Sequence, residues 1–190
     1  LPTATLQGCV NDANDMVAWL TAKLGFSAGD ISILTDAKAA KAAIMAGLRA
    51  MVDEAKAGRA TYLVFSFSSH GTQIPDLNGD EADKWDEAFC PYDTAAKGGQ
   101  WDPNTIIVDD ELHDLFLELP PTTLLEVYLD TCHSGTGLKA DDPAMILSPF
   151  HPKPRWLPPP SYRAFEAPRE LHALDTKRPG IDGLASRHHI

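Results

Sequence analysis

Two short, almost entirely apolar stretches constrain the fold of this chain more than any other feature. Residues 61–68 read TYLVFSFS and residues 124–129 read LLEVYL. Runs of this length and composition are typical of strands that are covered on both faces of a sheet. Segments with helical spacing precede the first run and lie between the two, which favours right-handed crossovers and a mostly parallel sheet. We therefore predict an α/β fold.

Three helices and one further strand are expected around these runs. Apolar residues recur with helical spacing in three segments, 11–24, 39–57 and 109–119. Asn11 and Asp12 are favourable N-cap residues for the first helix, and a glycine follows each of the first two. Residues 31–34 (ISIL) are expected to form a short strand.

Charge and cysteine content exclude several classes of function. The 190 residues include 16 basic and 27 acidic ones, and the net charge of −11 argues against nucleic acid or an anionic membrane as a partner. Three cysteines without a CxxC pair argue against a structural zinc site and favour free thiols in a reducing compartment. No apolar run could span a membrane and no signal peptide is visible, so we expect a cytoplasmic location. Since the chain opens at Leu1 and not at methionine, an N-terminal segment is expected to have been removed or left out.

Residues capable of nucleophilic catalysis follow both apolar runs. SSHG (68–71) comes after the first and DTCHSG (130–135) after the second. In a parallel sheet the carboxyl ends of neighbouring strands meet at one edge, so Cys132 and His70 are candidates for a catalytic dyad of thiolate and base. The backbone N–H groups of Gly71 and Cys132 would face the developing oxyanion. The alternative is that Cys132 is a small buried side chain and His70 a hydrogen-bonded loop histidine.

Five ordered motifs between residues 6 and 140 resemble the metacaspases and bacterial orthocaspases, which are caspase-like cysteine peptidases. The motifs are GCVNDA (8–13), SSHGTQ (68–73), DLNGDEADKWDEAFCPYD (76–93), VDDEL (108–112) and DTCHSG (130–135). The resemblance implies a three-layer α/β/α sandwich of caspase type. It also implies an endopeptidase that uses a Cys–His dyad and cuts protein or peptide substrates after Arg or Lys, whereas animal caspases cut after Asp.

The same resemblance implies a specificity pocket made by Cys9, Asp12, Ser68 and Asp130. Two carboxylates at a partly desolvated site would favour a guanidinium or ammonium group and reject an acidic side chain. Two simpler interpretations stay open. Asp12 would only cap the first helix, or do so in addition to lining the pocket, and Asp130 would only end a strand.

No cofactor is expected to be required, and calcium binding is doubtful. The acidic loop 76–93 departs from the EF-hand pattern, because Glu81 stands where that pattern needs glycine. Asp93, Asp109 and Asp110 match three carboxylate ligands of calcium-requiring metacaspases, but Lys139 stands at the position of the fourth. Asp109 and Asp110 would also be favoured simply because they open a helix. Cys90 is most simply a packed thiol.

The resemblance divides the chain into three parts. Residues 1–140 correspond to the catalytic large-subunit domain, 141–187 to a proline-rich inter-subunit loop or linker, and 188–190 to the start of the small-subunit region. With little chain before GCVNDA and no small subunit, the sheet is expected to be incomplete, and the chain to derive from a longer precursor. Self-processing is expected in the loop, at one of seven basic residues: Lys153, Arg155, Arg163, Arg169, Lys177, Arg178 or Arg187.

Two other functions stay open at this point. One is a caspase-like interaction or scaffold module without hydrolytic activity, although the intact His70 and Cys132 argue against it. The other is a calcium sensor built on loop 76–93 and the helix that begins at Asp109.

Overall fold

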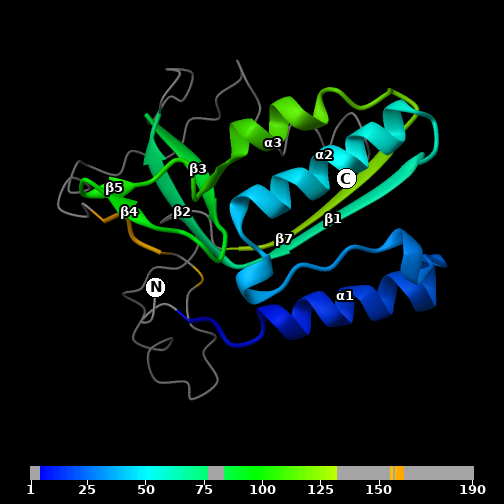
Figure 1. Cartoon of the computed structure of the whole chain (residues 1–190), viewed down its shortest axis with the longest axis horizontal. Coiled ribbons are helices and arrows are strands. Elements are labelled where there is room, and N and C mark those ends of the chain that lie inside the picture. Colours follow the sequence, from blue (N-terminus) through cyan, green and yellow to red (C-terminus); the bar gives the residue numbers. More distant parts are fainter. Residues whose placement is uncertain (1–4, 77–83, 132–154, 156, 161–190) are drawn as a thin grey trace, which may run out of the picture.

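The core of the molecule is a parallel strand pair held between helices on both faces (Figure 1). The computed structural model describes residues 5–76, 84–131, 155 and 157–160. In it β1 (Tyr62–Ser68) pairs in parallel with β7 (Leu124–Asp130). Helix α1 (Cys9–Leu24) covers one face of this pair, and α2 (Lys41–Lys56) and α3 (Asp109–Phe116) cover the other. The three-layer α/β/α arrangement expected from the sequence is confirmed.

The two faces of the pair are not equally covered. Leu63, Phe65 and Phe67 of β1 point into the main core, which α2 and α3 close with Leu48, Val52 and Phe116 among others. The alternate residues of β1 lie toward α1 and are only partly buried or exposed. Leu20 is the buried residue of α1. The face of β1 toward α2 and α3 is therefore fully covered, as predicted, whereas the face toward α1 is covered only in part.

Beside the parallel pair lies an antiparallel unit that the sequence patterns did not indicate. Its strand order is β2 (His70–Pro75), β3 (Trp85–Cys90) and β6 (Ile107–Val108). A hairpin of β4 (Ala96–Lys97) and β5 (Gln100–Trp101) is attached to it and turns at two glycines with φ of 63° and 81°. A second apolar core fills this unit, formed by Ile74, Ala88, Trp101, Ile106 and Val108, with Leu157 packed against it.

Two local predictions were wrong. Helix α1 begins at Cys9, so Asn11 and Asp12 lie inside its first turn, and the N-cap position belongs to Gly8 with φ of 124°. A side chain at that φ would be strained, which explains the glycine. Residues 31–34 form no strand, because among the described residues no strand pairs with them. A four-residue apolar run becomes a strand only when its backbone groups hydrogen-bond to a neighbouring strand.

The described residues contain no helix that is both long enough and apolar enough to cross a membrane. The proposed loop 141–187 and the segment 188–190 lie outside the described residues, apart from Arg155 and residues 157–160. The division of the chain into three parts therefore stays a prediction.

Candidate active site

The ends of β1 and β7 bring the first residues of the two predicted catalytic segments to one edge of the sheet. In the parallel register Ser68 pairs with Asp130, and the N–H of Ser69 donates to the carbonyl oxygen of Asp130 at 3.4 Å. His70 follows Ser68 by two residues, as Cys132 follows Asp130 by two. The two strands thus place Ser68 and Asp130, the first residues of the two segments, side by side.

His70 is positioned by the change from the parallel pair to the antiparallel unit. It is the first residue of β2 and pairs with Cys90 of β3. The hydroxyl of Ser69 donates to the carbonyl oxygen of Cys90 at 2.6 Å and so fixes the turn just before the histidine. Cys132 lies outside the described residues, so the dyad and the Cys132 N–H of the oxyanion site stay predictions.

Asp12, Ser68 and Asp130 do come together, as the pocket interpretation requires. The hydroxyl of Ser68 donates to Oδ2 of Asp12 at 2.6 Å, which joins the first turn of α1 to the end of β1. This hydrogen bond, together with the guanidinium of Arg155, lowers the pKa of Asp12 below its usual value of 3.8. Asp12 therefore lies inside the first turn of α1 and not at its N-cap, and its role in a specificity pocket stays a prediction.

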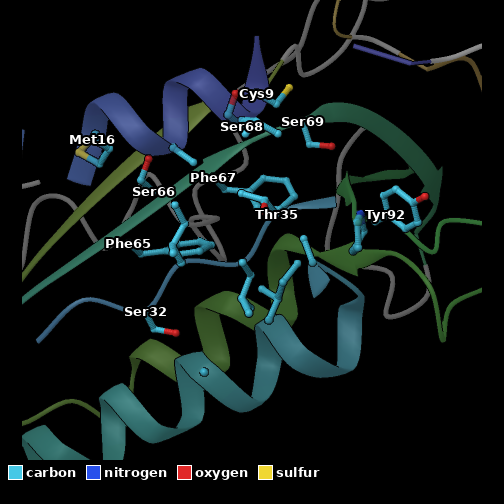
Figure 2. Close-up of a pocket in the computed structure, with 18 of the residues that line it drawn as sticks. Cys9, Met16, Ser32, Thr35, Phe65, Ser66, Phe67, Ser68, Ser69 and Tyr92 are labelled. Carbon is cyan, nitrogen blue, oxygen red and sulfur yellow. The ribbon is translucent and has the colours of Figure 1, made fainter. Parts of the chain in front are cut away.

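Cys9 lies at the mouth of the same region. It is a free, half-buried cysteine at the start of α1, and Figure 2 shows it beside Ser68 and Ser69 at one end of a cavity. That cavity has a volume of about 710 Å³ and extends between α1, β1 and α2, with Met16, Phe65 and Phe67 on its wall. Of the predicted pocket residues, Cys9 and Ser68 line its polar end, whereas the deeper part is apolar.

A guanidinium group of the chain itself lies between the carboxylates of Asp12 and Asp130. Nη2 of Arg155 lies 2.9 Å from Oδ2 of Asp12, and Nη1 lies 2.6 Å from Oδ2 of Asp130. Nη1 also donates to the carbonyl oxygen of Asp130 at 2.9 Å and to the hydroxyl of Ser68. Burial alone would lower the pKa of Arg155, but hydrogen bonding to Asp12 and the charge of Asp130 outweigh it, and the pKa is raised.

The backbone around Arg155 is bound to the start of β2. The N–H of Gly71 donates to the carbonyl oxygen of Arg155 at 2.7 Å, and the N–H of Leu157 donates back to the carbonyl oxygen of Gly71 at 2.8 Å. Thr72 adds a hydrogen bond from its hydroxyl to the carbonyl oxygen of Leu157 at 2.7 Å. The sequence had marked Arg155 only as one of seven basic residues in the loop, because no local pattern distinguishes a residue that binds a remote pocket.

The carboxylates proposed for calcium have other roles. Oδ1 of Asp93 accepts the N–H of Lys41 at 2.9 Å, at the first turn of α2. Asp109 and Asp110 open α3, and Asp109 is buried. Among the residues that the structure describes, no group of three His, Cys, Asp or Glu is arranged to hold a metal ion. These three aspartates therefore do not by themselves fit calcium, and calcium binding stays a prediction.

Cys90 is a packed thiol, as expected. It is 3% exposed, and burial raises the pKa of its thiol to about 12. At neutral pH it is therefore protonated and poorly nucleophilic.

Comparison with known proteins decides the family. A family model described as the metacaspase, peptidase C14 domain matches residues 2–141. The chain belongs to the metacaspase family. Metacaspase-1A of Aspergillus niger and Metacaspase-1 of Emericella nidulans are each 36% identical to it over 140 residues. Each match covers 70% of this chain and 32% of the relative, so the chain spans about a third of the length of these curated metacaspases.

A solved structure supports the same fold. A crystal structure of a Geobacter sulfurreducens protein matches with a TM-score of 0.53 and 32% sequence identity. The match covers 70% of this metacaspase chain and 44% of the other chain. The three layers seen here are thus those of a caspase-like fold.

Proposed function

We propose that this metacaspase is a cysteine endopeptidase that cleaves peptide bonds after Arg or Lys, with Cys132 as nucleophile and His70 as general acid and base. The observation that carries the proposal is the guanidinium held between the carboxylates of Asp12 and Asp130. A pocket that pairs each side of a planar guanidinium with a carboxylate favours arginine, accepts lysine as a simple cation and repels an acidic side chain.

The short length of backbone between the paired strand ends and the two proposed catalytic residues supports the dyad. Two residues of backbone span at most about 7 Å, so neither His70 nor Cys132 can lie far from the paired ends of β1 and β7. Adjacent strands lie about 4.8 Å apart. The side chains of the two residues can therefore meet without any rearrangement of the sheet.

The proposed reaction follows from these positions. Substrate binds with its basic side chain in the pocket and its carbonyl oxygen on the N–H of Gly71, the group that already donates to a peptide carbonyl at 2.7 Å. The Cys132 thiolate adds to the carbonyl carbon, and donors at Gly71 and Cys132 stabilise the oxyanion. His70 protonates the leaving amine and then activates the water that releases the acyl group. No step requires a metal ion.

Paired reporter peptides test this proposal. Two peptides that differ only in Arg or Asp before the scissile bond are offered to the full chain, together with any small-subunit region that belongs to it. We expect turnover of the Arg peptide, none of the Asp peptide, and loss of turnover on Cys132→Ala. A folded protein that cleaves neither peptide would favour a caspase-like interaction module without hydrolytic activity.

A further inference from the structure

A short segment of the chain lies along the outer edge of β2 and shows how this edge can hold a peptide (Figure 1). Among the described residues β2 is an outer strand of the antiparallel unit, since only β3 pairs with it. On the basis of the function proposed above, we propose that this edge and the second apolar core form the subsite for the part of the substrate that follows the scissile bond. The subsite selects a large apolar side chain, such as leucine, at the second position after the Arg or Lys.

The backbone of residues 155–157 is hydrogen-bonded to β2 as a neighbouring parallel strand would be. The N–H of Gly71 donates to the carbonyl oxygen of Arg155 at 2.7 Å, and the N–H of Leu157 donates to the carbonyl oxygen of Gly71 at 2.8 Å. One residue of β2 thus bonds to two residues that are two positions apart, which is the pattern of a parallel pair. Peptides that add a strand to a sheet edge gain affinity from such main-chain bonds and specificity from pockets for alternate side chains.

The position of Arg155 fixes the register of this segment relative to the proposed catalytic groups. Its guanidinium lies between the carboxylates of Asp12 and Asp130. Its carbonyl oxygen lies on the N–H of Gly71, which is the proposed oxyanion donor. Arg155 therefore stands where the basic residue of a substrate would stand, and Leu157 marks the second position after the scissile bond.

The side chain of Leu157 has an apolar partner in the antiparallel unit. It packs against the second apolar core, to which Ile74 and Trp101 belong, both of them buried. Ile74 lies on β2, so this core is part of the same unit that bonds to the segment through Gly71. An apolar side chain in this place covers apolar surface, whereas a charged one would lose its hydration against an apolar wall.

The hydroxyl of Thr72 is oriented toward the carbonyl group of the same position. Thr72 is fully buried, and its hydroxyl donates to the carbonyl oxygen of Leu157 at 2.7 Å. Nε1 of Trp101 donates to the hydroxyl oxygen of Thr72 at 2.8 Å. Because an indole N–H can only donate, the threonine oxygen is the acceptor there, and its own hydrogen is left for the peptide carbonyl. Thr72 and Trp101 therefore recognise an extended backbone at the position where the core favours an apolar side chain.

Peptides that differ at one position test this subsite. Reporter peptides with Arg before the scissile bond carry Leu, Ala or Asp at the second position after it. They are offered to the full chain, together with any small-subunit region that belongs to it, and kcat/KM is measured. We expect the Leu peptide to exceed the Ala peptide about tenfold, and the Asp peptide to be poorer than both. Peptides compared on one enzyme sample share any blocking by residues 155–157, so the ratio of their kcat/KM values reports the subsite alone.

A variant of Thr72 tests whether the carbonyl group at this position is recognised. For the wild type, kcat/KM should rise when the Arg peptide is extended from one to two residues after the scissile bond. Thr72→Val keeps the shape of the side chain but removes the donor, so this gain should shrink about tenfold, mostly through KM. Thr72→Ser should retain the gain. The matched control is Thr94→Val, which removes another buried hydroxyl and should leave the gain unchanged.

The results separate this proposal from the function on which it rests. If the Arg peptides are cleaved but Leu, Ala and Asp give equal kcat/KM values, or Asp is preferred, the subsite proposal is overturned and the peptidase function stands. The same holds if Thr72→Val and Thr94→Val have equal effects on the gain from extension. If a folded protein cleaves no Arg peptide, the peptidase function fails, and the substrate subsite fails with it.

Discussion

The hydroxyl of Ser68 lies 2.6 Å from Oδ2 of Asp12, a residue 56 positions earlier in the chain. This one hydrogen bond joins the end of the central strand β1 to the first turn of α1. It also orients a carboxylate toward the space that Arg155 fills. A residue that looked like a helix cap in the sequence thereby forms an ion pair with a guanidinium.

Asp12→Asn should weaken the selection of basic substrates. The variant keeps the shape of the side chain but loses one of the two negative charges that face the guanidinium. In the peptidase assay we expect kcat/KM for the Arg peptide to fall about tenfold, equivalent to about 1.4 kcal/mol, mostly through KM. Asp15→Asn, an exposed neighbour on α1, is the matched control and should change nothing. Equal effects of both substitutions would argue against the pocket.

The pH dependence of cation binding should follow Asp12. Its pKa is lowered, first by the hydrogen bond from Ser68, so its charged form is favoured in the folded protein. The charge of Asp12 contributes fully to cation binding at pH values above the usual pKa of 3.8. This contribution is lost as the pH falls through the lower pKa that Asp12 has in the folded protein. In a chain that carries both Cys132→Ala and Arg155→Gln, the affinity for the amidinium ligand benzamidine should therefore persist to below pH 4. Ser68→Ala should move the loss to higher pH, while Ser66→Ala on the exposed side of β1 should not.

Cys90 should resist alkylation in the folded protein. Burial raises the pKa of its thiol to about 12, so almost no thiolate exists at pH 8. Peptide mapping after iodoacetamide treatment should show slow labelling of Cys90 in buffer and rapid labelling in urea. Because the neutral thiol is the favoured form in the fold, stability should fall as the pH rises from about 9 toward 12. Labelling of Cys90 at the same rate with and without urea would contradict its buried position.

Leu125→Ala should destabilise the fold strongly. Leu125 of β7 is fully buried in the main core, and removing its side chain leaves a cavity between the sheet and the helices. We expect a loss of about 2 to 5 kcal/mol in the free energy of unfolding, measured by urea denaturation. Leu117→Ala removes the same atoms from a side chain that is 47% exposed and should cost far less. A small effect at Leu125 would mean that the parallel pair is not the centre of the core.

Asp93→Ala should act on stability and not on a calcium response. Its Oδ1 accepts the N–H of Lys41 at the start of α2, so its removal should cost about 1 kcal/mol of folding free energy, as loss of a helix cap does. Peptidase activity with calcium and with a chelator should be the same in the wild type, and the variant should not alter that ratio. Activation by calcium that is lost in Asp93→Ala would instead support a metal site.

Much of the central layer could be predicted from the sequence because it depends on local patterns. The apolar run at 61–68 and the helical spacing of Ile44, Leu48 and Ala55 reflect which side chains must leave water, and β1 and α2 formed close to where these patterns placed them. The strand predicted at residues 31–34 was wrong because a strand needs a neighbouring strand to hydrogen-bond with, and periodicity does not reveal which segments pair. The short strands of the antiparallel unit were missed for the same reason.

The sequence by itself determined the residue types that the chemistry needs and the strand ends from which they come: His70 after one apolar run, Cys132 after the other, and acidic residues beside both. Only the tertiary structure decided that Asp12 lies inside the first turn of α1 and not at its N-cap, and that one arginine among seven basic residues of the loop lies between two carboxylates. The physical reason is that helix and strand preferences arise between residues a few positions apart. The binding of Arg155 to Asp12, by contrast, joins groups 143 positions apart and exists only once the sheet and α1 are in place.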